Sequence, residues 1–297
     1  MGVDMTRRAV AGVISAQRQI EGGGFVVRRP FPTGRIEHID PFMLLDEMGP
    51  VVYEPGRAVG APDHPHRGFE TVTYIIDGEM EHRDSNGGHG VITPGAVQWM
   101  TAGAGVVHSE LPTDRMMRDG GRMHGFQLWV NLPAAKKMIP PRYQGFEAHE
   151  IPTVRADDHV LRVIAGSVAG TTGVVDTTSP ATYAHLTLGS GARFAWDPDD
   201  GHTVLVHVFS GSAVVNDTDA DDGSMVVCER SAGRVDIVAG DTGAEILLLA
   251  ALPLYEPVAR YGPFVMNTRE EIVRAFEDYE AGRLGSIVAS GPGVSRA

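Results

Sequence analysis

From about residue 24 the chain is a series of short apolar runs separated by turn residues. Residues 72–76 are β-branched or aromatic, and Asp77-Gly78 closes this run with a dipeptide that favours hairpins. Residues 97–100 and 125–131 have the same character. This spacing predicts an all-β chain of antiparallel sandwiches or barrels, and it disfavours a parallel sheet with helices between the strands.

The second half of the chain repeats the first at an offset of 133 residues. Pro65 and Gly68 align with Pro198 and Gly201, whereas aspartates stand opposite the two histidines that flank Pro65. A repeat with such a long period indicates a duplicated domain. We therefore expect two barrels, of which only the first keeps its histidines.

The repeat and the local composition suggest where the chain divides. We expect a first barrel over residues 1–135 and a second over residues 159–297. Residues 136–158 are richer in proline and charge, which is typical of a connection between domains.

A short helix is predicted near the C-terminus. Asn267 or Thr268 can cap it, with a glutamate three residues further on. Ile272, Phe276 and Tyr279 would form one apolar stripe along it, which we assign to packing.

Two stretches of the first half carry residues that bind metals. In an extended strand His64, His66 and Glu70 would share one face, and His108 and Glu110 would do so on their own strand. If the strands lie side by side, three imidazoles and a carboxylate meet, and this donor set suits a divalent first-row metal with open coordination positions. An isolated His-x-His pair is also common as polar surface, but the second stretch, which follows a glycine-rich run, favours the metal site.

These motifs resemble the pirin family of the cupin superfamily. The resemblance extends from about residue 28 to about residue 276 and is weaker between about 156 and 254. The stretches that carry it are residues 64–72, 98–103 and 262–268, together with 40–42, 45–47 and 128–132. It implies a bicupin, a fold of two cupin barrels, with one metal site in the N-terminal barrel.

The resemblance also implies roles for single residues. His64, His66, His108 and Glu110 would bind one divalent ion; we expect Fe(II), although other first-row metals fit the same donors. Glu70 would lie outside the metal sphere and orient an imidazole or the neighbouring arginine. If their strand faces inward, residues 98–100 would line the pocket.

Two functions are compatible with such a site. The first is an Fe(II)-dependent dioxygenase of the quercetin 2,3-dioxygenase type, which opens a flavonol-like substrate while Glu110 takes the hydroxyl proton. The alternative is a non-catalytic, iron-containing and redox-responsive module that binds a protein partner. A metal held for stability alone would be expected to have closed coordination.

The composition of the chain narrows the classes of function that remain. A formal net charge of −13 argues against direct binding to nucleic-acid phosphates, and no apolar run approaches the length of a membrane span. The single cysteine, Cys228, is typical of a cytoplasmic protein. The histidines without paired spacing are expected to be structural: His82, His89, His124, His185, His202 and His207.

Overall fold

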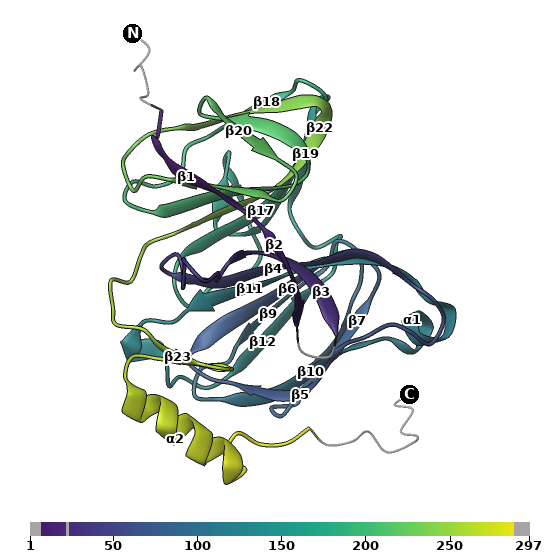
Figure 1. The fold of residues 1–297 in the computed structure, drawn as a ribbon, viewed down its shortest axis with the longest axis vertical. Helices are drawn as coiled ribbons and strands as arrows, with labels where there is room; N and C mark the ends of the chain where they lie inside the picture. Colours follow the sequence, from purple (N-terminus) through teal and green to yellow (C-terminus); the bar gives the residue numbers. More distant parts are fainter. Residues whose placement is uncertain (1–6, 22–23, 288–297) are drawn as a thin grey trace.

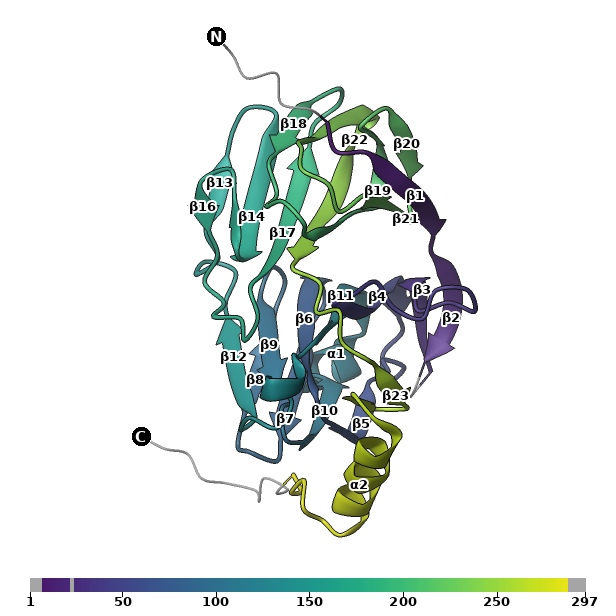
Figure 2. The same ribbon diagram turned by 90° about the vertical axis from the view of Figure 1, so that its left-hand side faces the viewer.

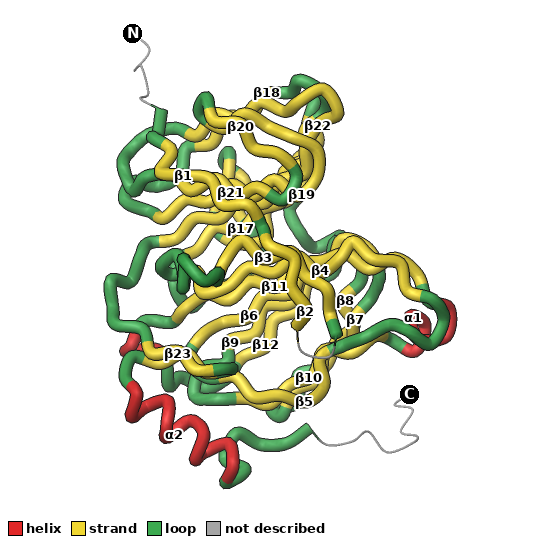
Figure 3. Tube along the Cα trace, in the orientation of Figure 1, coloured by secondary structure: helices red, strands yellow, loops and turns green. Residues whose placement is uncertain are grey.

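The computed structural model describes residues 7–21 and 24–287, and these residues form two β-barrels, one above the other in Figure 1. Strands make up most of both barrels, and helices occur only at their margins (Figure 3). The predicted all-β fold of two barrels with a C-terminal helix is therefore confirmed. In the described part of the chain, no helix is long and apolar enough to cross a membrane.

The N-terminal barrel consists of a seven-stranded and a four-stranded sheet. The larger sheet has the order β12 (Arg142–Phe146), β9 (Val97–Thr101), β6 (Phe69–Asp77), β11 (Gly121–Asn131), β4 (Phe42–Tyr53), β3 (Phe25–Phe31) and β2 (Gln17–Glu21). The smaller sheet has the order β5 (Ala61–His66), β10 (Val106–Pro112), β7 (Met80–Asp84) and β8 (His89–Ile92). Helix α1 (Asp114–Asp119) and a 3-10 turn (Ala134–Lys136) flank β11.

A nine-stranded sheet forms the C-terminal barrel. Its main path is β1 (Val10–Ser15), β21 (Ser224–Cys228), β19 (Thr203–Val215), β22 (Val235–Ala251), β17 (Ala181–Leu188), β14 (His159–Ala165) and β13 (Thr153–Arg155). Strand β18 (Arg193–Trp196) pairs with β22, and β20 (Thr218–Asp221) pairs with β19. Two small hairpins complete the fold: β15–β16 (Ser167–Val168, Thr171–Thr172) and β23–β24 (Ala259–Tyr261, Phe264–Met266).

Three strands depart from the division predicted from the sequence: β1, β12 and β13, the last of which lies in the expected connection and pairs with β14 of the C-terminal barrel. Strand β1 comes first in the chain yet pairs with β21 of the C-terminal barrel, and Figure 2 shows it reaching up along the side of that barrel. Strand β12 belongs to the stretch expected to be a connection, but it pairs with β9 at the edge of the N-terminal sheet. The division at residues 135 and 158 stays a prediction.

Helix α2 (Arg269–Glu280) begins at the predicted cap. The Thr268 hydroxyl accepts a hydrogen bond from the Glu271 backbone N–H, and the Glu271 carboxylate accepts one from the Thr268 N–H. Ile272 is buried, and Phe276 packs edge-on against Phe264 of β24 at 4.8 Å. Tyr279 is 39% exposed, so the apolar stripe is one turn shorter than predicted.

The two barrels share one apolar interface that surrounds a buried carboxylate. Phe126 and Phe209 meet there from opposite barrels with their rings 4.8 Å apart. Glu47 accepts two hydrogen bonds from Arg28, at 2.6 and 2.8 Å, and one from His124 at 2.9 Å. His207 of the other barrel lies 3.8 Å away. Burial opposes ionisation, but these donors lower the pKa of Glu47 to about 2.

The Glu47→Gln variant is expected to lower the free energy of unfolding at pH 7 by roughly 2–4 kcal/mol, because it removes a buried and fully paired charge. A carboxylate with a depressed folded pKa stabilises above its unfolded pKa, and that contribution is lost as pH falls from about 4.5 towards about 2. Denaturant unfolding of both proteins across this range should show the difference shrinking with acidification. The exposed Glu229→Gln variant is the control; a constant difference for Glu47→Gln would contradict this account.

Candidate metal centre

The candidate site is built on the antiparallel pairing of β5 with β10. In this register His64 lies opposite His108, and His66 lies opposite Val106. Strand β5 ends at His66, and the chain then turns at Gly68, whose φ of +89° suits glycine alone, because a Cβ there would meet the Val265 carbonyl oxygen. The two histidine motifs of the sequence therefore do come together, as the alternation of side chains predicted.

The three imidazoles of His64, His66 and His108 form one cluster. Their closest donor atoms all lie within 4.8 Å of one another, and their ring centroids are 4.3–4.8 Å apart. Nδ1 of His64 donates to the Pro62 carbonyl oxygen at 2.7 Å, and Nδ1 of His66 donates to the Pro263 carbonyl oxygen at 3.2 Å. In both rings Nε2 remains as the bare nitrogen that can bind a metal.

A fourth histidine, His82, indicates which ring nitrogen of His108 carries the proton. Asp84 can only accept, so His82 donates to it from Nε2 at 3.1 Å. Nδ1 of His82 then faces two donors, the Gln98 amide at 2.9 Å and Nδ1 of His108 at 3.4 Å, which share its one lone pair. This chain leaves Nε2 of His108 bare, and that atom is buried without a hydrogen-bond partner among the described residues.

The electrostatics of the cluster suit a cation. Burial, together with repulsion from the neighbouring imidazoles, holds the pKa of His66 and of His108 well below the usual value. These rings are therefore neutral near pH 7, which is the form that binds metals. A divalent ion would satisfy the orphaned Nε2 of His108, so the residues present fit a metal.

Glu110 lies beside the cluster on β10. Its Oε1 accepts a hydrogen bond of 2.5 Å from the hydroxyl of Thr73, which belongs to the other sheet. The donor atoms of Glu110, His108 and His82 also lie within 4.8 Å of one another. The structure thus groups Glu110 with His108, and it also brings in His82, which the sequence had placed among the structural histidines.

Glu70 does not share the face of the histidines, so that expectation was wrong. Strand β5 ends at His66, the chain turns at Gly68, and Glu70 belongs to β6 in the opposite sheet. Its Oε1 accepts hydrogen bonds of 2.7 Å from the hydroxyls of Thr101 and Thr178. Neither of these hydrogen bonds involves an imidazole or Arg67. Because Thr178 comes from the second half of the chain, Glu70 links the two barrels instead of orienting a ligand.

A cavity of about 610 Å³ opens onto the cluster. His64, His66 and Glu110 line it together with Trp129 and Arg260. Its volume lies in the range of sites for small aromatic ligands. The conditional prediction for residues 98–100 is not realised, because these side chains are buried in the protein and do not line the cavity.

The C-terminal segment closes one side of this site. Besides the Pro263 carbonyl, it supplies Asp278, which pairs with Arg67 at 2.7 Å. The buried ammonium of Lys137 donates to the carbonyl oxygens of Gly68 and Val265 at 2.8 and 2.9 Å. These contacts join the β23–β24 hairpin and helix α2 to the turn that follows the first histidine motif.

The corresponding place in the second barrel has no such cluster among the described residues. Asp197, which aligns with His64, forms an exposed ion pair with Arg234 at 3.0 Å. Other histidines predicted to be structural have ordinary partners: His185, for example, contacts Glu245 at 2.6 Å and Tyr74 at 2.9 Å.

Comparisons with known proteins agree with this architecture. The family model described as Pirin matches residues 24–130, and the model described as Pirin C-terminal cupin domain matches residues 183–285. A pirin-like protein of Caulobacter vibrioides is 42% identical over 290 residues, covering 94% of this chain and all of that protein. Human pirin is 37% identical over 285 residues, and the match covers 94% of this chain and 94% of human pirin.

A solved structure resembles the whole chain. The structure named quercetin 2,3-dioxygenase from Acinetobacter baumannii superposes with a TM-score of 0.90 at 39% sequence identity. The match covers 95% of this chain and all of that one.

The His82→Phe variant is expected to weaken metal binding by roughly 10- to 100-fold, because it removes the acceptor that orients His108. Phenylalanine keeps the ring that stacks on Tyr143 at 5.0 Å. Competition with a chelator, monitored at pH 7 with circular dichroism as a check of folding, would measure the change. Exposed His89→Gln, on the adjacent strand, is the control. Equal affinities of His82→Phe and the unaltered protein would show that the contact does not support the site.

Proposed function

Since this chain belongs to the pirin family, we propose that it is a metal-dependent dioxygenase that acts on flavonol-like aromatic substrates in the manner of quercetin 2,3-dioxygenases. His64, His66, His108 and Glu110 would hold one divalent ion, with Fe(II) as the proposed metal. When bound, this ion would supply the redox chemistry that cleavage by dioxygen requires.

The observation that carries the proposal is the opening of the imidazole cluster onto a cavity. A structural metal site would be closed by its ligands, whereas His64, His66 and Glu110 all line a cavity of about 610 Å³. Its apolar wall includes Phe25, Met48 and Trp129, which suits a planar aromatic ring. The name of the similar Acinetobacter structure supports the reaction type.

Glu110 is the residue proposed to move the proton. It is grouped with His108, and Thr73 holds its Oε1; by swinging between a metal ligand and a free base, its Oε2 would accept a proton from the substrate hydroxyl. His66 and His108, being neutral and buried, would serve as ligands throughout.

Turnover is tested by loading the purified protein anaerobically with Fe(II), admitting oxygen and adding quercetin. Oxygen uptake coupled to loss of the flavonol absorbance is expected, and the His64→Ala, His66→Ala double variant should lack both. Stoichiometric iron binding without either change would contradict the dioxygenase and favour the alternative of a redox-responsive module that binds a protein partner.

Glu110→Gln should retain the metal through the three imidazoles but lose turnover by roughly 10²- to 10⁴-fold, because the amide cannot accept the proton. Metal content and kcat measured on the same preparation separate the two effects. Glu81→Gln on the neighbouring strand, where Glu81 contacts His89 and Arg83, is the matched control. Full turnover by Glu110→Gln would rule out its role as the base.

A further inference from the structure

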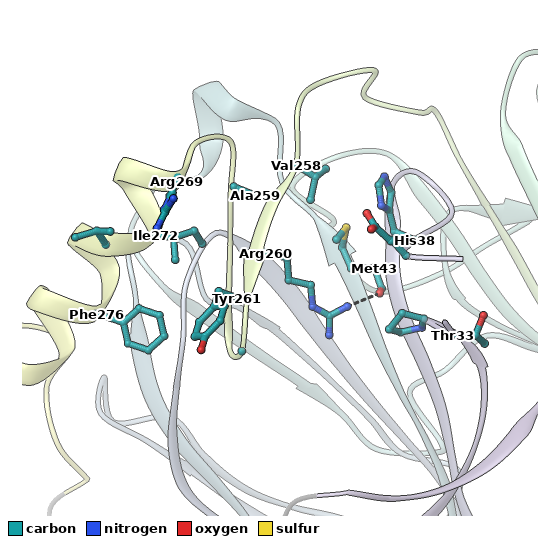
Figure 4. A pocket seen from close by; sticks show the side chains of 14 residues that line it. Thr33, His38, Met43, Val258, Ala259, Arg260, Tyr261, Arg269, Ile272 and Phe276 are labelled. Atoms are coloured by element: carbon teal, nitrogen blue, oxygen red, sulfur yellow. Dashed lines mark hydrogen bonds between the residues drawn. The ribbon is translucent and has the colours of Figure 1, made fainter. Parts of the chain in front are cut away.

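The β23–β24 hairpin separates two cavities, and one arginine of this hairpin lines both. On one side lies the metal cavity; on the other lies a groove of about 920 Å³ between the hairpin, helix α2 and residues 32–43. Arg260 lines both spaces, whereas Arg269 lines only the groove. Figure 4 shows Arg260 extending from the hairpin towards Met43, and Arg269 on the helix away from it.

The guanidinium of Arg260 is held in a fixed position. Its Cζ lies 4.9 Å from the centre of the Trp129 ring, and Nη1 donates to the Met43 carbonyl oxygen at 3.1 Å. Trp129 in turn packs edge-on against His66, with the ring centres 5.0 Å apart. One aromatic ring therefore separates this cation from a residue of the imidazole cluster.

The charge of Arg260 is not matched by a carboxylate in contact with it. Among residues 7–21 and 24–287, no carboxylate oxygen lies within 4.0 Å of the Arg260 guanidinium, the distance that defines an ion pair. Arg29, the other arginine of the cavity, contrasts with it, because Asp46 and Glu21 both contact it at 2.6 Å. Burial and the nearby Arg29 lower the pKa of Arg260, and Asp46 and Glu21, which do not pair with it, offset only part of this effect.

We propose that Arg260 is an anion-binding subsite of the metal cavity. It would bind a carboxylate or ionised hydroxyl on the far ring of a planar aromatic substrate whose other end reaches His64, His66 and His108. A guanidinium has five N–H donors in a plane, and the contact with Met43 uses one of them. This inference rests on the proposed function and narrows its substrates to aromatic compounds that carry a second acidic oxygen.

Anaerobic titration of the Fe(II)-loaded protein tests this preference without turnover. The two probes are unsubstituted flavonol and flavonol with a carboxylate on its pendant phenyl ring. Because hydrogen bonds to charged groups are the stronger ones, the carboxylated probe should bind about 10- to 100-fold more tightly. Arg260→Gln should abolish this preference, Arg260→Lys should retain part of it, and Arg269→Gln should retain all of it.

Several outcomes would overturn the inference. These are equal affinity of the unaltered protein for the two probes, an equal loss of affinity for both probes in Arg260→Gln, or a preference that Arg269→Gln abolishes, which would place the anion in the groove. Failure of the unaltered protein to bind either probe would do the same. Binding with the expected preference but without oxygen uptake would support the Arg260 subsite and contradict the dioxygenase. Oxygen uptake without a preference between the probes would support the dioxygenase and contradict the subsite.

Discussion

The pairing of β5 with β10 is the constraint on which the site depends. It sets His64 opposite His108, and it requires the chain to turn sharply at Gly68, where a side chain would meet the Val265 carbonyl. A shift of the register by one residue would turn every side chain of β5 to the other face and disperse the imidazoles. Strand β7 depends on the same register, because it pairs with β10 on the other side and so brings His82 opposite Glu110.

Burial gives this cluster its chemistry. Exclusion from water, together with repulsion from the neighbouring imidazoles, lowers the pKa of His66 and His108, so these two rings remain neutral. Among the described residues, the second barrel adds no side chain to the imidazole cluster, yet the segment that follows it supplies the Pro263 carbonyl that orients His66 and the arginine that borders the cavity. The duplicated half thus acts on the site through the hairpin and helix at its end.

Much of this arrangement could be predicted from the sequence. Turn spacing and the long repeat predicted two barrels, and alternation predicted that His64, His66 and His108 meet. The prediction for Glu70 was wrong because an alternating pattern does not reveal that the strand ends at His66 and that the chain turns at Gly68 with a positive φ. His82 and Asp84 show the same alternation, and this signal could have drawn attention to them, but their place beside His108 is set by strand pairing. Arg260 has no local signal, since only tertiary packing brings it to Trp129.

The central claim is that the N-terminal barrel holds one metal ion through the three imidazoles and Glu110. Anomalous X-ray diffraction from crystals grown with Fe(II), recorded at the iron absorption edge, tests this claim most directly. We predict a single peak bonded to Nε2 of His64, His66 and His108, with the Glu110 carboxylate beside it. A peak elsewhere, for instance near Asp197 of the second barrel, or a peak that leaves Nε2 of His108 unbound, would contradict the account.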